Sequence, residues 1–390
     1  MMYFILGSHP LLSLSELKAV LGTDFHPVFQ SSAILLNKNA SQNPAMLQER
    51  LAGVIKIGRI VSSVETWDVQ KITDLITSLL TTVEGKNKIS FGLSLYNLDD
   101  PQKTKGLEKQ LDALGLTIKK QLKQKERPVR YVKGKEPRLS SAIVETNGLL
   151  TSGGEFALFV SKRGIFIGQT SSIQPFKAWS KRDFGRPRRD AKNGMLPPKL
   201  ARMMINLSGV NPTDSTILDP FCGSGTVLME ATLMGFKEII GGDIWQKAMD
   251  DTRMNMDWLI EEFQLSQPKM SLYTTSAADL PKVYSNPVDT IVTEVFLGNP
   301  RTRTINTQEG QRLEQELIPL FHSSFSALKR VLKPSGKAVV AFPAFKQKDD
   351  SWYRLPLHDL LTSLGYTILE QHLYFRPNQF VARDIVVLTS

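Results

Sequence analysis

The sequence predicts an α/β protein, with a Rossmann-like, mostly parallel sheet in the C-terminal half and a smaller α+β region before it. Three observations predict this architecture. Residues 217–225 form an apolar run that ends in an acid and a glycine-rich turn. A helix-forming stretch follows, and then a second apolar run, Ile239–Gly242, which ends in Asp243. Beyond it strand-like and helix-like segments alternate, which is the order of a parallel sheet covered by helices.

The N-terminal half is typical of α+β units of the ferredoxin-like kind. Ser13 is a candidate cap for a helix that ends at Gly22, and Asp68 for a helix whose apolar residues recur at helical spacing. The run Ser161-Lys-Arg-Gly164 is a turn signal inside a long strand region. We expect helices at 13–21, 44–51, 69–80 and 105–125, and strands at 3–6, 33–36, 54–64, 87–98, 142–146 and 156–170.

A basic connector punctuated by proline and glycine, at about residues 175–198, separates this half from a more regular one. The last two strands of the C-terminal half flank the turn Arg376-Pro-Asn378 and should pair antiparallel at the edge of the sheet. The prediction is a seven-stranded sheet, mostly parallel with one reversed strand. Its strands fall near 215–220, 238–243, 270–275, 288–295, 337–343, 366–375 and 382–388, with helices near 199–207, 226–235, 245–263 and 311–332. The expected domains are residues 1–65, 66–174 and 175–390.

The glycine-rich turn Asp219-Pro-Phe-Cys-Gly-Ser-Gly-Thr226 is suited to a nucleoside ligand. Glycines allow a close approach of the backbone, because a Cβ there would clash. The helix that follows offers unpaired N–H groups to a negatively charged moiety. Asp243 lies 20 residues after Gly223, where a carboxylate can accept both ribose hydroxyls. Neither Gly-x-Gly-x-x-Gly nor Gly-Lys-Ser/Thr is present, which argues against a dinucleotide or a nucleoside triphosphate.

Composition limits the classes of protein to consider. The 390 residues are 41% hydrophobic and 22% charged, which suits two or three globular domains. No apolar run approaches the roughly 18 residues that cross a bilayer, so we expect no membrane association. The single cysteine, Cys222, excludes internal disulfides, and the histidines lack ligand spacing. We therefore expect a cytoplasmic protein without a metal site.

The net charge of +10 is concentrated in two stretches. Residues 101–140 hold 12 Lys/Arg against 4 Asp/Glu, and residues 177–202 hold 9 against 2. Concentrated cationic charge on an otherwise acidic chain favours a polyanion site, with a merely solvated basic face as the alternative.

The run Asp219–Thr226 resembles motif I of class I S-adenosylmethionine-dependent methyltransferases, which implies S-adenosylmethionine as the cofactor. After their third strand such enzymes commonly carry Asp-Ala-x-x-Leu, and here the sequence is Ser276-Ala-Ala-Asp-Leu-Pro281. Either Ser276 or Asp279 is a candidate adenine contact, although Asp279 is equally a candidate capping residue. The other cofactor contacts implied by the resemblance are Asp219, Pro220, Phe221, Gly223, Gly225, Thr226, Asp243 and Ile244.

Candidate catalytic residues follow the fourth predicted strand. An exocyclic base amine is a poor nucleophile, and hydrogen-bond acceptors on its N–H groups favour the pyramidal nitrogen of the transition state. Amino-methyltransferases carry Asp/Asn-Pro-Pro-Tyr here, and its aromatic ring stacks on the extruded base. Glu294 stands in the place of the acid, Phe296 is a candidate stacking ring, and both prolines are absent. Glu294 replaces the shorter acid, or the site has decayed to a cofactor- or RNA-binding remnant, or Glu294 is a helix or loop cap.

Three blocks resemble the THUMP-containing tRNA (guanine-N2) methyltransferases, especially the archaeal type that acts on guanine 10. The resemblance implies that residues 66–174 form a THUMP-like RNA-binding region and that the C-terminal domain methylates guanine N2 with a divergent Asp/Asn-Pro-Pro-Tyr motif. Guanine in ribosomal RNA, adenine N6 in DNA and a non-catalytic RNA-binding protein are the alternatives. The blocks are Ser180–Pro187 with Gly194–Ala201 and Ile205–Leu207; Asp219–Thr226 with Glu230-Ala and Gly242-Asp243; and Tyr3–Gly7, Ser13–Leu21 and Ile55–Arg59.

A protein that binds a tRNA stem works through phosphates and 2′-hydroxyls, because the A-form major groove hides the base edges. Trp179 and Phe184 in the connector could stack on bases or anchor its packing. The expected partner is tRNA; the oligomeric state is open, with a monomer favoured. The candidate RNA contacts are Lys119, Lys120, Lys123, Lys125, Arg127 and Arg130 in the first basic stretch, and Arg182, Arg186, Arg188 and Arg189 in the connector.

Overall fold

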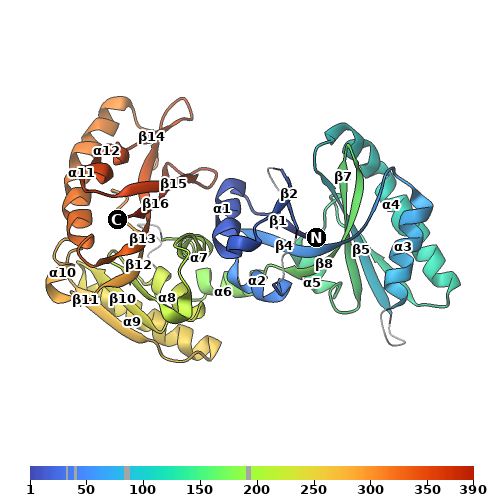
Figure 1. Cartoon of the computed structure of the whole chain (residues 1–390), viewed down its shortest axis with the longest axis horizontal. Coiled ribbons are helices and arrows are strands. Elements are labelled where there is room, and N and C mark those ends of the chain that lie inside the picture. Colours follow the sequence, from blue (N-terminus) through green and yellow to red (C-terminus); the bar gives the residue numbers. More distant parts are fainter. Residues whose placement is uncertain (32–33, 39–41, 83–87, 190–194) are drawn as a thin grey trace. The chain divides into compact units, whose positions relative to one another are not determined.

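In the computed structural model the chain forms two compact units, Met1–Phe176 and Lys177–Ser390 (Figure 1). The finer division into residues 1–65, 66–174 and 175–390 stays a prediction. Ala33, Asn87 and Gly194, which belong to predicted segments, lie outside the described residues. Among the described residues, no helix is long and apolar enough to cross a membrane. The structure describes all residues except 32–33, 39–41, 83–87 and 190–194.

The N-terminal unit contains a mixed sheet with the strand order β2-β3-β1-β4-β8-β7-β5-β6. The pairs β5–β6 and β5–β7 are parallel, and the other pairs are antiparallel. The strands are β1 (Met2–Leu6), β2 (Pro27–Gln30), β3 (Ile34–Asn37), β4 (Val54–Val64), β5 (Ile89–Asn97), β6 (Val129–Val132), β7 (Gly153–Ser161) and β8 (Gly164–Ile173). The helices are α1 (Pro10–Leu21), α2 (Pro44–Arg50), α3 (Val69–Thr81), α4 (Pro101–Gln124) and α5 (Ser141–Thr146).

Helix α4 shows how the basic stretch is placed. The Asp100 side chain caps its N-terminus by accepting the Lys103 N–H at 3.0 Å. Leu107, Leu111, Leu114, Ile118 and Leu122 recur at helical spacing and are buried against the sheet. Apolar burial on one face leaves lysines on the other, so the cationic surface follows from the periodicity of the helix.

Two predictions for this unit are wrong. Residues 142–146 form the helix α5 and not a strand, because Ser140 caps it by accepting the Ile143 N–H at 3.3 Å. Helix α1 begins at Pro10, so Ser13 lies inside it and donates to the His9 carbonyl at 3.0 Å instead of capping. The capping role of Asp68 in α3 and the turn between β7 and β8 are confirmed.

The C-terminal unit contains the predicted sheet, with the strand order β11-β10-β9-β12-β13-β16-β15. Strand β16 runs antiparallel to both β13 and β15, and the pairs from β11 to β13 are parallel. The prediction of a mostly parallel sheet with one reversed strand is confirmed, and the short β14 (Trp352–Arg354) adds to β13. The strands are β9 (Thr216–Asp219), β10 (Glu238–Asp243), β11 (Lys269–Thr274), β12 (Val288–Glu294), β13 (Leu332–Lys346), β15 (Thr367–Tyr374) and β16 (Val381–Thr389).

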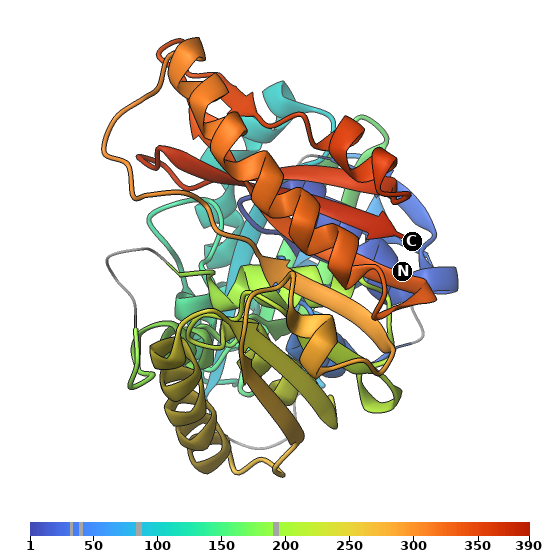
Figure 2. The same ribbon diagram turned by 90° about the vertical axis from the view of Figure 1, so that its left-hand side faces the viewer.

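Helix α11 (Thr307–Leu328) covers one face of this sheet, and Figure 2 shows it in orange across the front of the strands. It begins at a capping box in which Asn306 accepts the Glu309 N–H at 2.8 Å. Its Phe321 and Phe325 pack against Phe342 in the core. The other helices are α6 (Phe176–Phe184), α7 (Pro198–Leu207), α8 (Thr226–Leu233), α9 (Gln246–Phe263), α10 (Leu280–Val283) and α12 (Leu357–Ser363).

The strand order places the predicted site residues at one edge. Leu218 of β9 pairs with Ile240 of β10 on one side and with Ile291 of β12 on the other. From β9 the chain therefore builds the sheet first in one direction and then in the other. Ligands of open parallel sheets bind beyond the carboxyl ends of the strands at such a switch point. The carboxyl ends of β9, β10 and β12 carry the acids of the candidate site.

Candidate active site

Two glycines shape the loop between β9 and α8. Gly223 and Gly225 have φ values of +51° and +84°, a region that residues with a Cβ rarely adopt. A Cβ on Gly225 would lie 2.9 Å from the Thr252 side chain of α9, and Thr252 donates to the Gly223 carbonyl at 2.8 Å. A Cβ on Gly223 would meet no atom within 4 Å. Thr252 of α9 thus holds one side of the loop, and the space next to Gly223 is open.

Asp243 fastens this loop to the tip of β10. One carboxylate oxygen accepts the Gly223 N–H at 3.1 Å, and the other accepts the Trp245 N–H at 3.0 Å. Each carboxylate oxygen has two acceptor positions, so these two bonds leave capacity for a ligand's hydroxyls. Ile244 is 59% exposed beside it. The open loop and the half-buried carboxylate fit a ribose-bearing cofactor.

Asp219 has a different environment from Asp243. Its side chain is buried, and it accepts the Thr293 hydroxyl at 2.6 Å and the Phe221 N–H at 3.2 Å. Burial raises the pKa of Asp219 to about 7, although both hydrogen bonds act in the opposite direction. Asp219 therefore links the glycine loop to Thr293 of β12 through hydrogen bonds.

The two candidate adenine contacts share one turn after β11. Ser276 donates its hydroxyl to Asp279 at 2.7 Å and accepts the Asp279 N–H at 3.1 Å. Lys282 lies 2.6 Å from the other oxygen of Asp279, and its hydrogen bond, with that of Ser276, lowers the pKa of this carboxyl. The turn presents both side chains at the same edge as Asp243, and their contact with a cofactor stays a prediction.

Glu294 lies at the tip of β12 and pairs with an arginine that sequence reasoning missed. Arg383 of β16 donates from Nε to Glu294 Oε1 at 2.5 Å, and from Nη2 to the Met195 carbonyl at 3.3 Å. Arg383 is 5% exposed, so the pair sits at the base of the site. Because 89 residues separate the partners, only sheet pairing brings them together. Phe296, two residues after Glu294, is 46% exposed, whereas Val295 between them is buried.

Two of the connector arginines are buried, which corrects their prediction as RNA contacts. Arg186 is 3% exposed and donates to the Thr226 hydroxyl at 2.6 Å. Arg182 donates to Glu230 at 2.7 Å and lies 3.9 Å above the Trp179 ring. Arg202 of α7 pairs with the second oxygen of Glu230 at 2.8 Å. These cations brace α8, the helix of the glycine loop, and the buried Trp179 anchors packing.

The remaining predicted RNA contacts lie nearer the surface. Arg188 and Arg189 are exposed, and Arg189 lies 5.1 Å from the ring of Phe184, which is itself 62% exposed. Asn255 of α9 holds this segment by bonding to both backbone groups of Arg188 and to the Ser224 carbonyl. In the N-terminal unit, Lys120, Lys123, Lys125 and Arg130 are exposed, and Lys119 and Arg127 are half-buried.

The strand order with its reversed strand and the glycine-loop cradle define the class of α/β methyltransferases. A family model described as "RMKL-like, methyltransferase domain" matches residues 186–351, and one described as "DNA methylase" matches residues 96–254. The chain belongs to the methyltransferase family that includes the "Probable tRNA (guanine(10)-N2)-dimethyltransferase" of Methanothermococcus thermolithotrophicus. It is 32% identical to that relative over 147 residues, which are 37% of this chain and 78% of the relative.

Two further relatives are named "tRNA (guanine(10)-N2)-dimethyltransferase". The one from Methanothermobacter thermautotrophicus is 36% identical over 134 residues, or 34% of this chain and 36% of the relative. The one from Methanocaldococcus jannaschii is 31% identical over 172 residues, or 42% of this chain and 43% of the relative. The chain thus spans less than half the length of these two relatives.

Solved structures agree with the fold. The crystal structure of TrmN from Thermus thermophilus matches with a TM-score of 0.55 at 16% identity, covering 100% of both chains. A possible methylase from Clostridium difficile 630 matches with a TM-score of 0.51 at 11% identity, covering 99% of this chain and 97% of that one. At these identities the likeness shows the fold alone.

Proposed function

We propose that the chain is an S-adenosylmethionine-dependent tRNA methyltransferase that modifies N2 of guanine 10. The observation that carries the proposal is the placement of the Gly223–Asp243 cradle and of Glu294 at the carboxyl edge of one sheet. The cradle suits a nucleoside cofactor, and the neighbouring acid suits an amine. The names of the archaeal relatives support guanine 10 as the target.

The cofactor proposal rests on groups that fit a ribose and an adenine. Asp243 would accept the ribose hydroxyls, since its oxygens retain acceptor positions. Ile244 would cover the adenine with its exposed side chain, and the Ser276 turn would meet its amine. Once bound, S-adenosylmethionine supplies a methyl group activated on a sulfonium.

Glu294 would act on the acceptor amine. The bound cofactor would supply the methyl group and would keep the electron pair of the carbon–sulfur bond, and the N2 amine would release its proton to water. A carboxylate that accepts an N2–H favours the pyramidal nitrogen of this transition state. Arg383 occupies one oxygen of Glu294, and among the described residues no other group hydrogen-bonds to it. The second oxygen would then accept from the amine, while the buried guanidinium of Arg383 holds the carboxylate.

Phe296 would bind the face of the target base. Within a stem the N2 amine of guanine is base-paired and its lone pair is conjugated with the ring, so we expect the nucleotide to leave the stack before reaction. The exposed Phe296 ring stands two residues beyond Glu294, within the same loop. Stacking there compensates part of the unstacking free energy, and the glutamate then meets the edge of the base.

The lysines and arginines of the N-terminal unit would bind the body of the tRNA. Lys120 and Lys123 are exposed on α4, and Lys125 and Arg130 follow close to its end. Such groups bind phosphates of A-form RNA without reading its sequence. The THUMP-like assignment of residues 66–174, the tRNA partner and the cytoplasmic location belong to this proposal.

The test is mass spectrometry of nucleosides after incubating an unmodified tRNA transcript with labelled methyl donor. We expect label in N2-methylated guanosine, and its loss when guanine 10 of the transcript is replaced by adenine. A Glu294→Gln variant is the matched control, because it keeps the shape of the side chain. Label in another base, or none in any RNA, would overturn the proposal.

Ribosomal RNA guanine is a second candidate substrate. Residues of this chain are 59% identical over 39 positions to "Ribosomal RNA large subunit methyltransferase K/L" of Shewanella baltica, which is 10% of this chain and 6% of that one. Adding large-subunit RNA to the same assay distinguishes the two substrates. If ribosomal RNA is the substrate, label should appear in it and not in tRNA.

A further inference from the structure

The loop that follows Glu294 is fixed along the carboxyl half of β13. At its start the Val295 N–H donates to the Ala341 carbonyl at 3.2 Å, and at its end the Ile305 N–H donates to the Lys346 carbonyl at 2.9 Å. Both ends of the loop are thus tied to the same strand. The loop between them therefore starts and ends beside the strand that pairs with Glu294.

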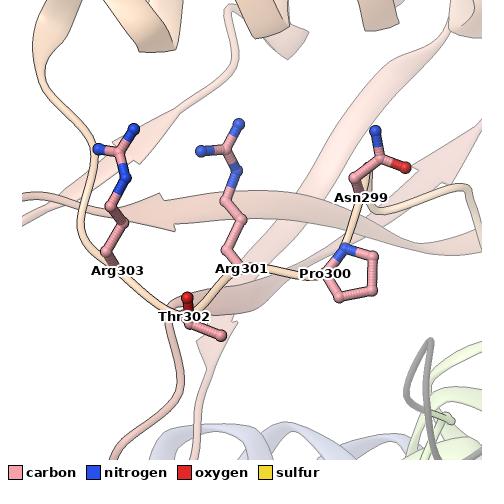
Figure 3. Close-up of a pocket in the computed structure, with 5 residues that line it drawn as sticks. All are labelled: Asn299, Pro300, Arg301, Thr302 and Arg303. Atoms are coloured by element: carbon pink, nitrogen blue, oxygen red, sulfur yellow. The ribbon is translucent and has the colours of Figure 1, made fainter.

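Residues Asn299–Arg303 of this loop line a pocket of about 250 Å³. Figure 3 shows the side chains of Asn299, Arg301 and Arg303 extending to the same side of the loop, while Thr302 points the other way. The loop bends at Asn299, Thr302 and Arg303, and this course leaves the three side chains on one side. All three side chains end in N–H donors, and no carboxylate is among the five lining residues. The lining therefore suits an anion.

The two arginines differ in what already binds them. Arg303 pairs with both oxygens of Glu309, at 2.6 and 3.3 Å, and this glutamate also completes the capping box of α11. Arg301 lies 5.5 Å from the Phe345 ring, and its buried Nε has no hydrogen-bond partner among the described residues. Among the described residues no carboxylate is hydrogen-bonded to this guanidinium, so its terminal N–H groups can bind a ligand while the ring holds its face.

We propose that Arg301 binds a backbone phosphate of the RNA, adjacent to the nucleotide whose base meets Glu294. A guanidinium matches two phosphate oxygens with two parallel hydrogen bonds, and the Asn299 amide supplies a further donor. Arg303 lies beside this site, and its ion pair with Glu309 offsets its charge. Because an extruded base swings about its own backbone, anchoring the neighbouring phosphate sets where the amine arrives. Arg301 is a positioning residue, and its role rests on the proposed function.

The test compares full-length variants in equilibrium binding to an unmodified tRNA transcript over a series of salt concentrations. Arg301→Gln keeps most of the aliphatic part of the side chain over Phe345 and removes the charge. Arg301→Lys keeps the charge but lacks the two parallel N–H donors of the guanidinium. Arg330→Gln is the matched control, because Arg330 is an exposed arginine just beyond the C-terminal end of α11, near the amino end of β12. Binding of S-adenosylhomocysteine, followed by calorimetry, and the melting temperature are measured for each variant.

We expect Arg301→Gln to weaken tRNA binding about tenfold, as for one charge-assisted contact. The slope of log affinity against log salt should fall by about 0.7 to 0.9. Arg301→Lys should retain that slope with part of the affinity, and Arg330→Gln should match the wild type. S-adenosylhomocysteine should bind equally to all of them.

Wild-type affinity and salt slope in Arg301→Gln would overturn the inference, as would a loss confined to S-adenosylhomocysteine binding. Because the assay measures tRNA binding, it does not depend on methyl transfer. If the wild type binds tRNA but methylates no guanine, the proposed function fails while the comparison at Arg301 still decides the phosphate contact. If the wild type binds no tRNA, both fail.

Discussion

Replacing Asp219 by asparagine should remove a pH dependence from the stability of the C-terminal unit. Burial raises the pKa of Asp219 to about 7 in the folded protein, against about 3.9 in an unfolded chain. The folded state therefore holds this proton more tightly. The stability contributed by the protonated carboxyl is fully present below about pH 4 and is lost as the pH rises through about 7. The two pKa values differ by about 3, which corresponds to roughly 4 kcal/mol.

Asparagine keeps the shape of the side chain and an oxygen that can accept from Thr293 and Phe221. Urea unfolding followed by tryptophan fluorescence is a suitable assay, since four of the five tryptophans lie in the C-terminal unit: Trp179, Trp245, Trp258 and Trp352. Between pH 4.5 and pH 8 the free energy of unfolding of the wild type should fall relative to Asp219→Asn by about 3 kcal/mol. Burial also raises the pKa of Asp384, but that group is common to both proteins and cancels in the difference. Parallel pH profiles for the two proteins would refute the reasoning.

Three further variants test the cradle, the acid and the RNA surface. Asp243→Ala removes acceptors for two hydroxyls, each worth about 0.5–1.5 kcal/mol, so calorimetry should show S-adenosylhomocysteine binding weakened by roughly 5- to 150-fold; unchanged affinity would exclude the ribose contact. Glu294→Gln should lower kcat by about 100- to 1000-fold with S-adenosylhomocysteine affinity retained, and a near-normal rate would remove Glu294 from the mechanism. Charge reversal at Lys120 and Lys123 together should weaken tRNA binding and flatten its salt dependence, whereas a salt slope equal to that of the wild type would contradict their role.

The architecture of the C-terminal unit was predictable because its signals are local. The strands on either side of the glycine loop, β9 and β10, contain short apolar runs, and the bounds of β10 match the predicted 238–243. The glycine loop was equally predictable, since the positive φ values of Gly223 and Gly225 favour glycine at both positions. The secondary structure of the N-terminal unit was harder to predict from the sequence. A β-branched run at 142–146 favoured a strand by composition, but the Ser140 cap stabilises a helix there.

The burial of charged side chains was not predictable from local sequence. Arg182 and Arg186 lie in a run of cations that looks like an RNA-binding surface, yet Glu230 and Thr226 of α8 bind them in the interior. Their partners lie 40 residues or more along the chain. No spacing rule relates such positions, and only the packing of α6 and α7 against α8 decides which arginines face water.

By itself the sequence determined the periodicities, the glycine loop and the acids at the strand tips, because each depends on residues a few positions apart. The tertiary structure alone decided what those acids contact. Glu294 meets Arg383 because β16 inserts antiparallel beside β13, and Asp219 meets Thr293 because β12 lies next to β9. Contacts of this kind depend on the order of the strands, which brings together residues far apart in the sequence. Closing the long loops between them costs conformational entropy, and local sequence patterns do not show which loops close.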